Sequence, residues 1–235
     1  MEETGKNPIQ VAERLFQVIE RLAENGPMGI MDLSAELGFH KSTTHRLVTS
    51  LQYMGYIRQD EESLKYALSL KFLEIGSKIL EQTNMASLIH PSLKKLSEQT
   101  GETVHLVRRE GTEAVYIDKV ESTVSSIRMV SRVGSRIPLY CSGVGKALLA
   151  ELPDPEIEDI WNSSEITSLT PYTVTSLSDL MDRIRGVREA GFAMDDEENE
   201  EGVRCIAVSI PDYHKEPVYA LSISAPVSRM TDARI

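Results

Sequence analysis

Seven consecutive residues near the amino terminus combine hydroxyl, imidazole and cationic side chains. They are His40, Lys41, Ser42, Thr43, Thr44, His45 and Arg46. Short hydroxyls and the amides at a helix N-terminus can approach phosphate oxygens closely, and an arginine one turn further on can reach a phosphate or a guanine edge. In an isolated helix, the same residues are more often a cap and a solvated charge. They therefore indicate DNA contacts only if the surrounding elements form a DNA-binding motif.

The surrounding segments follow the order of a winged helix-turn-helix. Apolar residues at steps of three and four predict three helices, and two short extended runs predict a hairpin after them. These segments are residues 8–25, 30–37, 41–54, 56–58 and 65–68. We expect Gly38 to form the turn before the third helix and Ser42 or a neighbour to cap that helix. In this motif the helix after the turn enters the major groove, which places the seven residues against DNA.

Charge is distributed unevenly along the chain. Its 235 residues hold 25 Lys+Arg and 36 Asp+Glu, a net charge of −11, which argues against a surface that binds nucleic acid or anionic membrane all over. Residues 1–80 hold nine basic and eleven acidic residues, a net of −2, whereas residues 81–235 carry −9. Residues 37–59 hold no carboxylate but include Lys41, Arg46 and Arg58. We therefore predict one electropositive face on an acidic protein, and we add Arg58 to the DNA-binding residues.

Small and polar residues in the C-terminal part suit a small anion or a hydroxylated ligand. Gly143 and Gly145 precede an apolar helix and would leave its first amides free to approach an anion. Ser222 and Ser224 lie two apart in a predicted strand, so both hydroxyls face the same side, although such a pair can equally serve packing between strands. Asp195 could accept a hydrogen bond from a ligand hydroxyl or orient a donor.

No catalytic or metal-binding set emerges from the reactive residues. Cys205 would need a nearby base to act as a nucleophile, with His105 and His214 as candidates, and a free cysteine is more often a small buried hydrophobe. The segment around Ser142 matches neither a phosphate-binding loop nor a nucleophile elbow, because Tyr140 stands where both motifs need glycine. The histidines and cysteines lack paired metal-ligand spacing. We predict no enzyme activity, no metal and no cofactor.

The C-terminal part combines helical and extended patterns. After helical stretches at 70–80 and 86–99, the apolar period falls from near four to two. Strands are predicted at 103–109, 114–120, 126–131, 204–210 and 218–225, with helices at 145–151 and 179–190. The pattern indicates a mixed α/β domain with an antiparallel sheet. No apolar run approaches the roughly 18 residues of a membrane helix, and the acidic start is unlike a signal peptide, so we expect a soluble, cytoplasmic protein.

Several of these segments resemble the IclR family of bacterial transcription regulators. In the N-terminal part the resemblance rests on residues 31–38, 41–48, 51–57 and 65–70. In the C-terminal part it rests on SRVGSRIPL at 131–139, SGVGKA at 142–147, GFAMDDEE at 191–198, GVRCIA at 202–207 and ALSISAP at 220–226, followed by Arg229. Several spaced motifs in the family's order make the resemblance specific, and it covers the chain from about residue 9 onward.

The resemblance implies an α+β chain with three parts. These are a winged helix-turn-helix at 7–68, a linker helix at 69–84 and a GAF-like α/β effector domain with an antiparallel sheet at 85–235. The family's effector pocket, carried over by position, has small, hydroxyl-bearing walls that suit a 2-oxo acid or a sugar acid. It would be lined by Ser126, Met129, Gly143, Val144, Asp195, Val203, Cys205, Ser222 and Ser224.

The resemblance also implies partners. Family members bind operator DNA as homodimers or tetramers, and they usually continue with a long helix after the segment that holds Arg229. Because this chain stops at Ile235, we expect a truncation that weakens the pocket and tetramer formation.

We therefore predict a DNA-binding transcriptional regulator of a carbon-catabolic operon, controlled by a small organic-acid or sugar-acid effector. Sugar-acid regulators look nearest in the hairpin and linker. The alternative is a small-molecule-binding enzyme or sensor whose winged helix makes protein contacts only. The sequence leaves open whether the regulator represses or activates.

Overall fold

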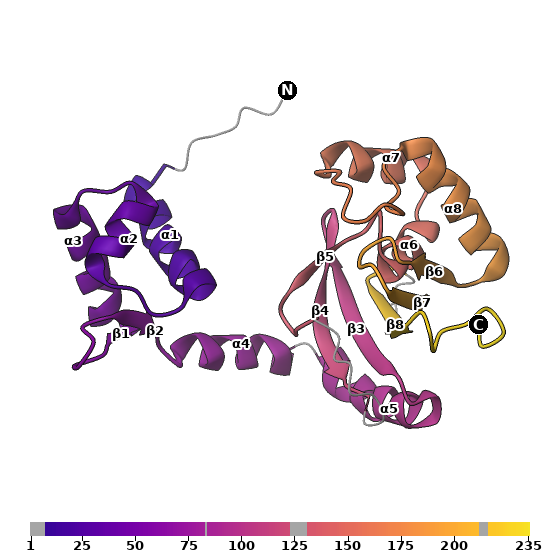
Figure 1. The fold of residues 1–235 in the computed structure, drawn as a ribbon, viewed down its shortest axis with the longest axis horizontal. Helices are drawn as coiled ribbons and strands as arrows, with labels where there is room; N and C mark the ends of the chain where they lie inside the picture. Colours follow the sequence, from indigo (N-terminus) through magenta and orange to yellow (C-terminus); the bar gives the residue numbers. More distant parts are fainter. Residues whose placement is uncertain (1–7, 83, 123–130, 212–215) are drawn as a thin grey trace. The chain divides into compact units, whose positions relative to one another are not determined.

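The computed structural model describes residues 8–82, 84–122, 131–211 and 216–235. The chain divides into two compact units, residues 1–82 and 83–235, and each is described by itself. The division falls within the 69–84 segment assigned to a linker helix, and the exact domain boundaries stay predictions. Figure 1 labels the elements of both units. None of the described helices is long and apolar enough to cross a membrane.

The described part of the first unit contains helices and a two-stranded hairpin. They are α1 (Gln10–Asn25), α2 (Ile30–Leu37), α3 (Lys41–Tyr53), β1 (Ile57–Gln59), β2 (Tyr66–Leu68) and α4 (Lys71–Gln82). The two strands pair antiparallel, with Arg58 opposite Ala67. Gly38 ends α2 in the left-handed conformation, at φ 65°, which glycine adopts without steric cost. The order of elements confirms the predicted winged helix-turn-helix.

The apolar faces of the first three helices meet in one core. Val18 of α1, Leu33 of α2 and Leu51 of α3 are at most 1% exposed, and the hairpin adds Ile57 and Tyr66 to the same cluster. Removing each such leucine from water stabilises the unit by about 2 kcal/mol. One face of α3 is therefore fixed against this core, and its other face is left exposed.

The start of α3 differs from the prediction that the side chain of Ser42 or a neighbour caps this helix. His40 is the N-cap residue, and no side chain caps the helix there. Ser42 lies inside the first turn and is exposed. An N-terminus without a side-chain cap leaves its first amides available to an external acceptor.

The second unit is an antiparallel sheet with helices on both faces. Its elements are α5 (Asn84–Thr100), β3 (Thr103–Glu110), β4 (Glu113–Val120), β5 (Arg136–Pro138), α6 (Gly143–Ala150), α7 (Asp154–Ser163), α8 (Leu177–Ala190), β6 (Ala193–Asp196), β7 (Val203–Ile210) and β8 (Tyr219–Pro226). The strand order is β5-β4-β3-β8-β7-β6, with every adjacent pair antiparallel. The predicted fold class is confirmed. The predicted strand at 126–131 lies outside the described residues, apart from Ser131.

Helices cover the two faces of this sheet separately (Figure 1). Leu93 of α5 packs with Leu106 on one face, whereas Leu148 of α6 packs in the cluster that contains Val107 and Ile184 on the other. Leu106 and Val107 are neighbours in β3, so the alternation of a strand sends them to opposite faces. The second unit therefore has two apolar layers, and α6 lies within the larger one.

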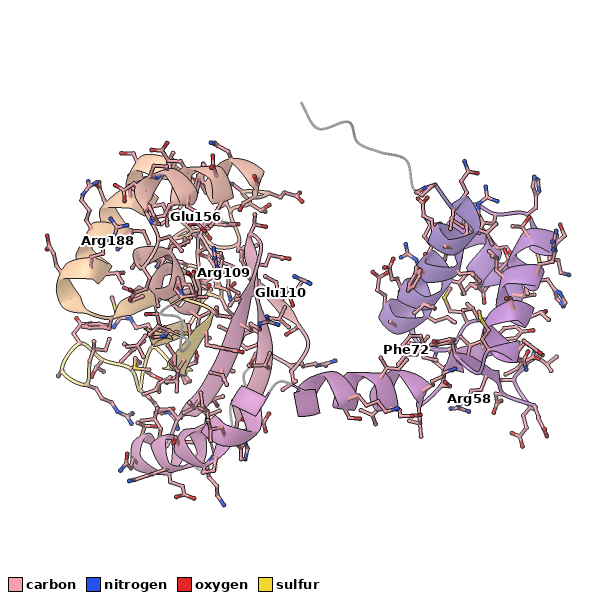
Figure 2. The ribbon with its side chains drawn as sticks, turned by 180° about the vertical axis from the view of Figure 1, so that it is seen from behind. Arg58, Phe72, Arg109, Glu110, Glu156 and Arg188 are labelled. Atoms are coloured by element: carbon pink, nitrogen blue, oxygen red, sulfur yellow. The ribbon has the colours of Figure 1, made fainter. Side chains whose placement is uncertain are left out.

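Ionic and polar contacts hold the helices of the larger layer in place. Arg188 of α8 donates to the carbonyl oxygens of Ala150 and Leu152, at 2.9 and 2.7 Å, and Arg109 of β3 pairs with Glu156 of α7 at 3.0 Å (Figure 2). Seven of the eight residues of α6 are buried, because it lies between the sheet and α8. This burial fixes the position of the α6 N-terminus.

Candidate functional sites

The predicted DNA-contact residues lie mainly on the exposed side of α3. Those that are exposed are His40, Lys41, Ser42, His45 and Arg46, together with Arg58 on β1, which Figure 2 labels. Thr43 is half-buried. Thr44 is fully buried, and its hydroxyl bonds to the His40 carbonyl at 3.4 Å. Position 44 faces the core, so the prediction of a DNA contact by the Thr44 side chain is wrong.

The exposed side of α3 is electropositive. Arg21 and Lys78 are the cations that form ion pairs in the described part of the first unit. Among the described residues, Lys41 and Arg46 therefore have no carboxylate partner within ion-pair distance. Two such cations beside the first amides of α3 make this side of the unit suited to an anion.

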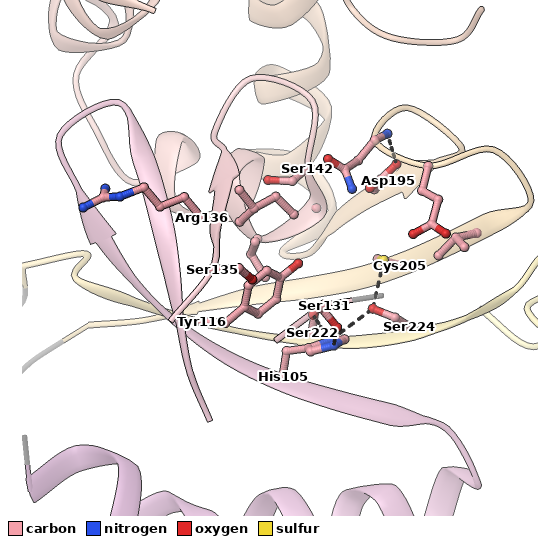
Figure 3. Close-up of a pocket in the computed structure, with 16 residues that line it drawn as sticks. His105, Tyr116, Ser131, Ser135, Arg136, Ser142, Asp195, Cys205, Ser222 and Ser224 are labelled. Carbon is pink, nitrogen blue, oxygen red and sulfur yellow. Dashed lines mark hydrogen bonds between the residues drawn. The ribbon is translucent and has the colours of Figure 1, made fainter. Parts of the chain in front are cut away.

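A pocket of about 430 Å³ opens in the second unit beside the N-terminus of α6 (Figure 3). The sequence predicts seven of its lining residues: Gly143, Val144, Asp195, Val203, Cys205, Ser222 and Ser224. The other two predicted residues, Ser126 and Met129, lie outside the described residues. The structure thus brings together every predicted pocket residue that it describes.

Strand register places these side chains on one face of the sheet. Asp195 of β6 lies opposite Cys205 of β7, and Cys205 lies opposite Ser224 of β8. Ser222 lies opposite His105 of β3. Directly opposed residues of antiparallel strands share a face, so four strands contribute to one polar surface. The predicted common side of Ser222 and Ser224 is confirmed, because both hydroxyls lie 3.3–3.4 Å from Nδ1 of His105.

His105 is central to this surface, although the prediction of the pocket did not include it. Its Nε2 lies 2.7 Å from the Ser131 hydroxyl, and its ring centroid is 5.1 Å from that of Tyr116. Burial, followed by the positive charge of Lys119, lowers the pKa of His105 to about 3. The imidazole is therefore neutral near pH 7 and offers one donor and one acceptor. A lone histidine within the apolar run 104–107 was the available signal in the sequence.

The start of α6 forms another wall of the pocket. Ser142 caps the helix by accepting a hydrogen bond from the Gly145 N–H at 3.1 Å. The prediction that Gly145 leaves its amide free is therefore wrong. Gly145 is needed for space, because a Cβ there would lie 2.1 Å from the Leu139 carbonyl oxygen. Gly143 and Val144 line the pocket, and first-turn amides such as theirs have no acceptor within the helix.

Asp195 supplies a buried acidic group to the pocket and is 3% exposed. Its Oδ1 accepts hydrogen bonds from the N–H groups of Glu198 and Asn199, at 2.8 and 3.3 Å. Burial raises the pKa of Asp195 to about 6, although the positive charge of Lys146 opposes the rise. Asp195 therefore changes its charge near neutral pH, donating a hydrogen bond when protonated and only accepting when ionised.

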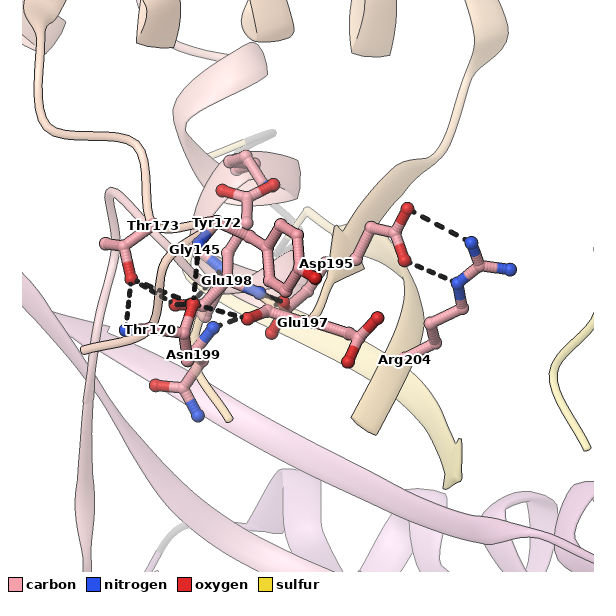
Figure 4. Close-up of polar contacts among 12 residues, drawn as sticks. Gly145, Thr170, Tyr172, Thr173, Asp195, Glu197, Glu198, Asn199 and Arg204 are labelled. Atoms are coloured by element: carbon pink, nitrogen blue, oxygen red, sulfur yellow. Dashed lines mark hydrogen bonds and ion pairs between the residues drawn. The ribbon is translucent and has the colours of Figure 1, made fainter. Parts of the chain in front are cut away.

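A buried ion pair supports the turn that follows Asp195; Figure 4 shows this turn, with Glu198 and its contact to Thr173. Nζ of Lys146 in α6 lies 2.5 Å from Oε1 of Glu198, and the two side chains are 1% and 2% exposed. The Thr173 hydroxyl donates to the Glu198 carbonyl at 2.6 Å. Oε2 of Glu198 is buried without a hydrogen-bond partner among the described residues. The ion pair joins α6 to the turn after β6, the two elements that carry the amides and the carboxyl group of the pocket.

The reactive groups of the pocket are not arranged for covalent catalysis. Burial and the negative charge of Asp195 raise the pKa of Cys205 to about 12, whereas a nucleophilic cysteine needs a thiolate near neutral pH. Sγ of Cys205 lies 3.0 Å from the Ser224 hydroxyl. His214, the other candidate base, lies outside the described residues. No cluster of His, Cys, Asp and Glu that could hold a metal ion occurs in the described ranges. The observed groups are suited to hydrogen bonding with a ligand.

The pocket lining also includes residues from loops and from strands near the sheet edge that the sequence did not predict. Besides His105, they are Tyr116, Ser131, Ser135, Arg136, Ile137, Ser142, Asn199 and Glu200. The Tyr116 ring extends into the pocket (Figure 3). Four of the missed residues, Ser131, Ser135, Arg136 and Ile137, belong to the SRVGSRIPL segment on which the resemblance partly rests. That segment was the available signal in the sequence.

Models of two protein families match the chain. One, described as the IclR helix-turn-helix domain, matches residues 11–61, and the other, described as bacterial transcriptional regulator IclR C-terminal, matches residues 77–235. The chain is 36% identical to the transcriptional repressor IclR of Escherichia coli over 230 residues, which cover 97% of this chain and 84% of the relative. It is 36% identical to the HTH-type transcriptional regulator KdgR of Escherichia coli over 232 residues, covering 98% and 88%.

A solved structure extends the likeness to the fold. The crystal structure of the Thermotoga maritima IclR has a TM-score of 0.80 and 32% identity to this chain, covering 96% of this chain and 91% of that one. The relatives are named as regulators and repressors, which confirms a DNA-binding regulator with an effector-binding domain and does not support an enzyme. Both units match in order and over nearly their full length, so this chain belongs to the IclR family of bacterial transcriptional regulators.

Proposed function

We propose that this protein is a cytoplasmic repressor that releases or rearranges on operator DNA when a small acid occupies the pocket of its second unit. The pocket carries this proposal, because it combines helix-terminal amides, a titrating carboxyl group and several hydroxyls in about 430 Å³. Repression is supported by relatives such as the acetate operon repressor of Salmonella typhimurium. A regulator of this kind must meet chromosomal DNA, which supports the cytoplasmic location.

The lining favours a hydroxylated acid as the effector. The first amides of α6, at Gly143 and Val144, suit a carboxylate, while Asp195 and the hydroxyls around His105 suit ligand hydroxyls. The pocket volume falls within the ~300–1,000 Å³ typical of small-molecule sites. A sugar acid would fill more of this volume than the smallest 2-oxo acids, which would also fit, so the volume favours a sugar acid.

DNA would be bound by the exposed side of α3 and by the hairpin. His40, Lys41, Ser42, Thr43, His45 and Arg46 would contact bases and phosphates in the major groove, and Arg58 would contact the adjacent backbone. We propose a homodimer or tetramer, because symmetric copies would then read two half-sites. Effector binding would shift the population between arrangements with different half-site spacing.

The pocket is tested by calorimetry with pyruvate, glyoxylate and 2-keto-3-deoxygluconate. Ser222→Ala should weaken the affinity for the acid that binds by about fivefold or more, because it removes a hydroxyl beside His105. Ser209→Ala is the matched control: Ser209 lies on β7, the strand next to the one that carries Ser222, but it bonds to Glu151 at 2.7 Å and does not line the pocket. Unchanged affinities in both Ser222→Ala and Asp195→Ala would show that the ligand binds elsewhere.

A further inference from the structure

We propose that the groove between α1 and α3 is a second phosphate-binding site for DNA, in which Arg14 acts together with Arg46. This site rests on the proposed DNA-binding function and extends it to α1, a helix that no prediction placed at the DNA. The groove has a volume of about 320 Å³. Its polar lining consists of two guanidinium groups, Arg14 and Arg46, and two hydroxyls, Thr43 and Ser50.

The two arginines are not neutralised within the described part of the chain. The lining of the groove contains no carboxylate. The ion pairs described in the first unit involve Arg21 and Lys78 instead. Two guanidinium groups in one groove repel each other unless an anion lies between them, and a phosphodiester oxygen accepts several guanidinium hydrogen bonds at once.

Arg14 is positioned by an aromatic ring. Its guanidinium carbon lies 5.4 Å from the ring centroid of Phe39, in the turn that leads into α3. A guanidinium group held by an aromatic ring keeps its N–H groups available for a phosphate and loses less side-chain freedom on binding. The ring therefore connects Arg14 with the entry to the DNA-contacting helix.

A neighbouring groove, between α1 and the end of α2, has the reverse charge. It is lined by three carboxylates, on Glu20, Glu24 and Glu36, and by Arg21, with Gln17, Leu37 and Phe39 completing it. Arg21 is paired with Glu24 at 3.0 Å and with Glu36 at 3.7 Å. An acidic groove repels phosphate, whereas the groove toward α3 attracts it. The difference in charge between the two grooves favours the groove toward α3 as the place for a DNA phosphate.

A DNA phosphate, and not a free anion, is the expected occupant. Arg46 lies on α3, the helix proposed to enter the DNA major groove. The sugar-phosphate backbone of the DNA borders the major groove and therefore passes beside this helix. Phosphate contacts of this kind add affinity on every sequence and release counterions. The site would therefore increase binding without selecting the operator sequence.

The test compares Arg14→Gln with Arg21→Gln in the full chain. The probes are a DNA fragment from upstream of its own gene and a scrambled fragment, titrated between 50 and 200 mM salt. Arg14→Gln should weaken binding to both fragments by about three- to tenfold and reduce the slope of log K against log salt by about one. Arg21→Gln should match the wild type, and Arg14→Lys should restore most of the slope because it keeps the charge.

Each result separates the site from the wider function. Salt-sensitive binding by the wild type with an unchanged slope in Arg14→Gln would overturn the phosphate site and leave DNA binding intact. Absence of salt-sensitive binding by the wild type would overturn the proposed function itself. Inorganic phosphate added at constant ionic strength should not compete with DNA, and competition at millimolar concentration would instead indicate a site for the free anion. Thermal unfolding of each variant checks that the fold is retained.

Discussion

At the scale of single residues, burial decides which charges the pocket presents to a ligand. Asp195 has its pKa raised to about 6, and His105 has its pKa lowered to about 3. Near pH 7 the pocket therefore offers a largely ionised carboxylate and a neutral imidazole. A ligand that needs Asp195 as a hydrogen-bond donor would bind more tightly as the pH falls toward 6, and one that needs a carboxylate would bind more weakly.

Asp195→Asn tests this burial through the pH dependence of stability. An aspartate whose folded pKa is raised contributes stability below its ordinary pKa of 3.8, and loses that contribution as the pH rises through about 6. Asparagine keeps an oxygen for the two backbone N–H groups and does not titrate. Between pH 4 and pH 7, the variant should gain on the wild type by about 2 kcal/mol in free energy of unfolding.

Urea denaturation at several pH values measures this gain. Asp159→Asn is the control, because Asp159 is exposed on α7 and its replacement should leave the pH profile of the wild type unchanged. Parallel profiles for the wild type and Asp195→Asn would contradict the raised pKa.

At the scale of elements, α6 positions the site because it is packed on all sides. Gly145 allows the helix to approach the backbone of Leu139, where a Cβ would meet the carbonyl oxygen at 2.1 Å. Lys146, the next residue, pairs with Glu198 in the turn after β6. The amides of the α6 N-terminus are therefore held in place by one close contact and one ion pair.

Gly145→Ala should destabilise the second unit by about 3 kcal/mol or more, because the backbone of Leu139 cannot move away cheaply. Gly186→Ala in α8 is the matched control. A Cβ at Gly186 meets nothing within 4 Å, so alanine should stabilise that helix by about 0.5–1 kcal/mol. Chemical denaturation followed by circular dichroism measures both changes. A loss in Gly145→Ala no larger than that of an ordinary surface substitution would show that the close approach is unimportant.

The Lys146–Glu198 pair should behave as a unit. Lys146→Met leaves a buried carboxylate without its cation and should cost about 3–5 kcal/mol, whereas Lys146→Met combined with Glu198→Leu removes both charges and should recover most of that loss. A double-mutant cycle in urea measures the coupling. If the loss of unfolding free energy in the double variant equals the sum of the losses in Lys146→Met and in Glu198→Leu, the two side chains do not stabilise the fold through their ion pair.

The sequence predicted the elements with clear periodicity and the two strands of the hairpin, and it did not predict β5, β6 and α7. The helices of the first unit and the long strands β3, β4, β7 and β8 follow from apolar spacing. Strands β5 and β6 are only three and four residues long, too short to show a period of two, and α7 buries Ile157 alone. His105 lies in the pocket because β3 pairs with β8 and places it opposite Ser222, and this strand pairing could not be predicted from the sequence. Gly145 was predicted to leave an amide free, because the sequence does not show that the backbone of Leu139 lies against it.

For the whole molecule, the net charge alone argues against DNA binding, whereas the distribution of charge along the chain is consistent with it. The overall charge of −11 belongs mainly to residues beyond 80, whereas the exposed side of α3 and the α1–α3 groove carry arginine and lysine. An acidic protein can thus bind DNA through one face while the rest of its surface repels it. Regulation then requires that occupancy of the pocket changes the affinity of this face.

The linkage between pocket occupancy and DNA binding is measured as DNA affinity with and without effector. Fluorescence anisotropy of the full chain on DNA from upstream of its own gene would be recorded with pyruvate, glyoxylate and 2-keto-3-deoxygluconate, for the wild type, Arg46→Ala and Ser222→Ala. We predict that one acid changes the wild-type affinity by about 5- to 150-fold, that Ser222→Ala reduces this response, and that Arg46→Ala loses DNA binding. Equal DNA binding by Arg46→Ala and the wild type, with no response to any acid, would show that this protein does not couple an acid in the pocket to DNA binding by α3.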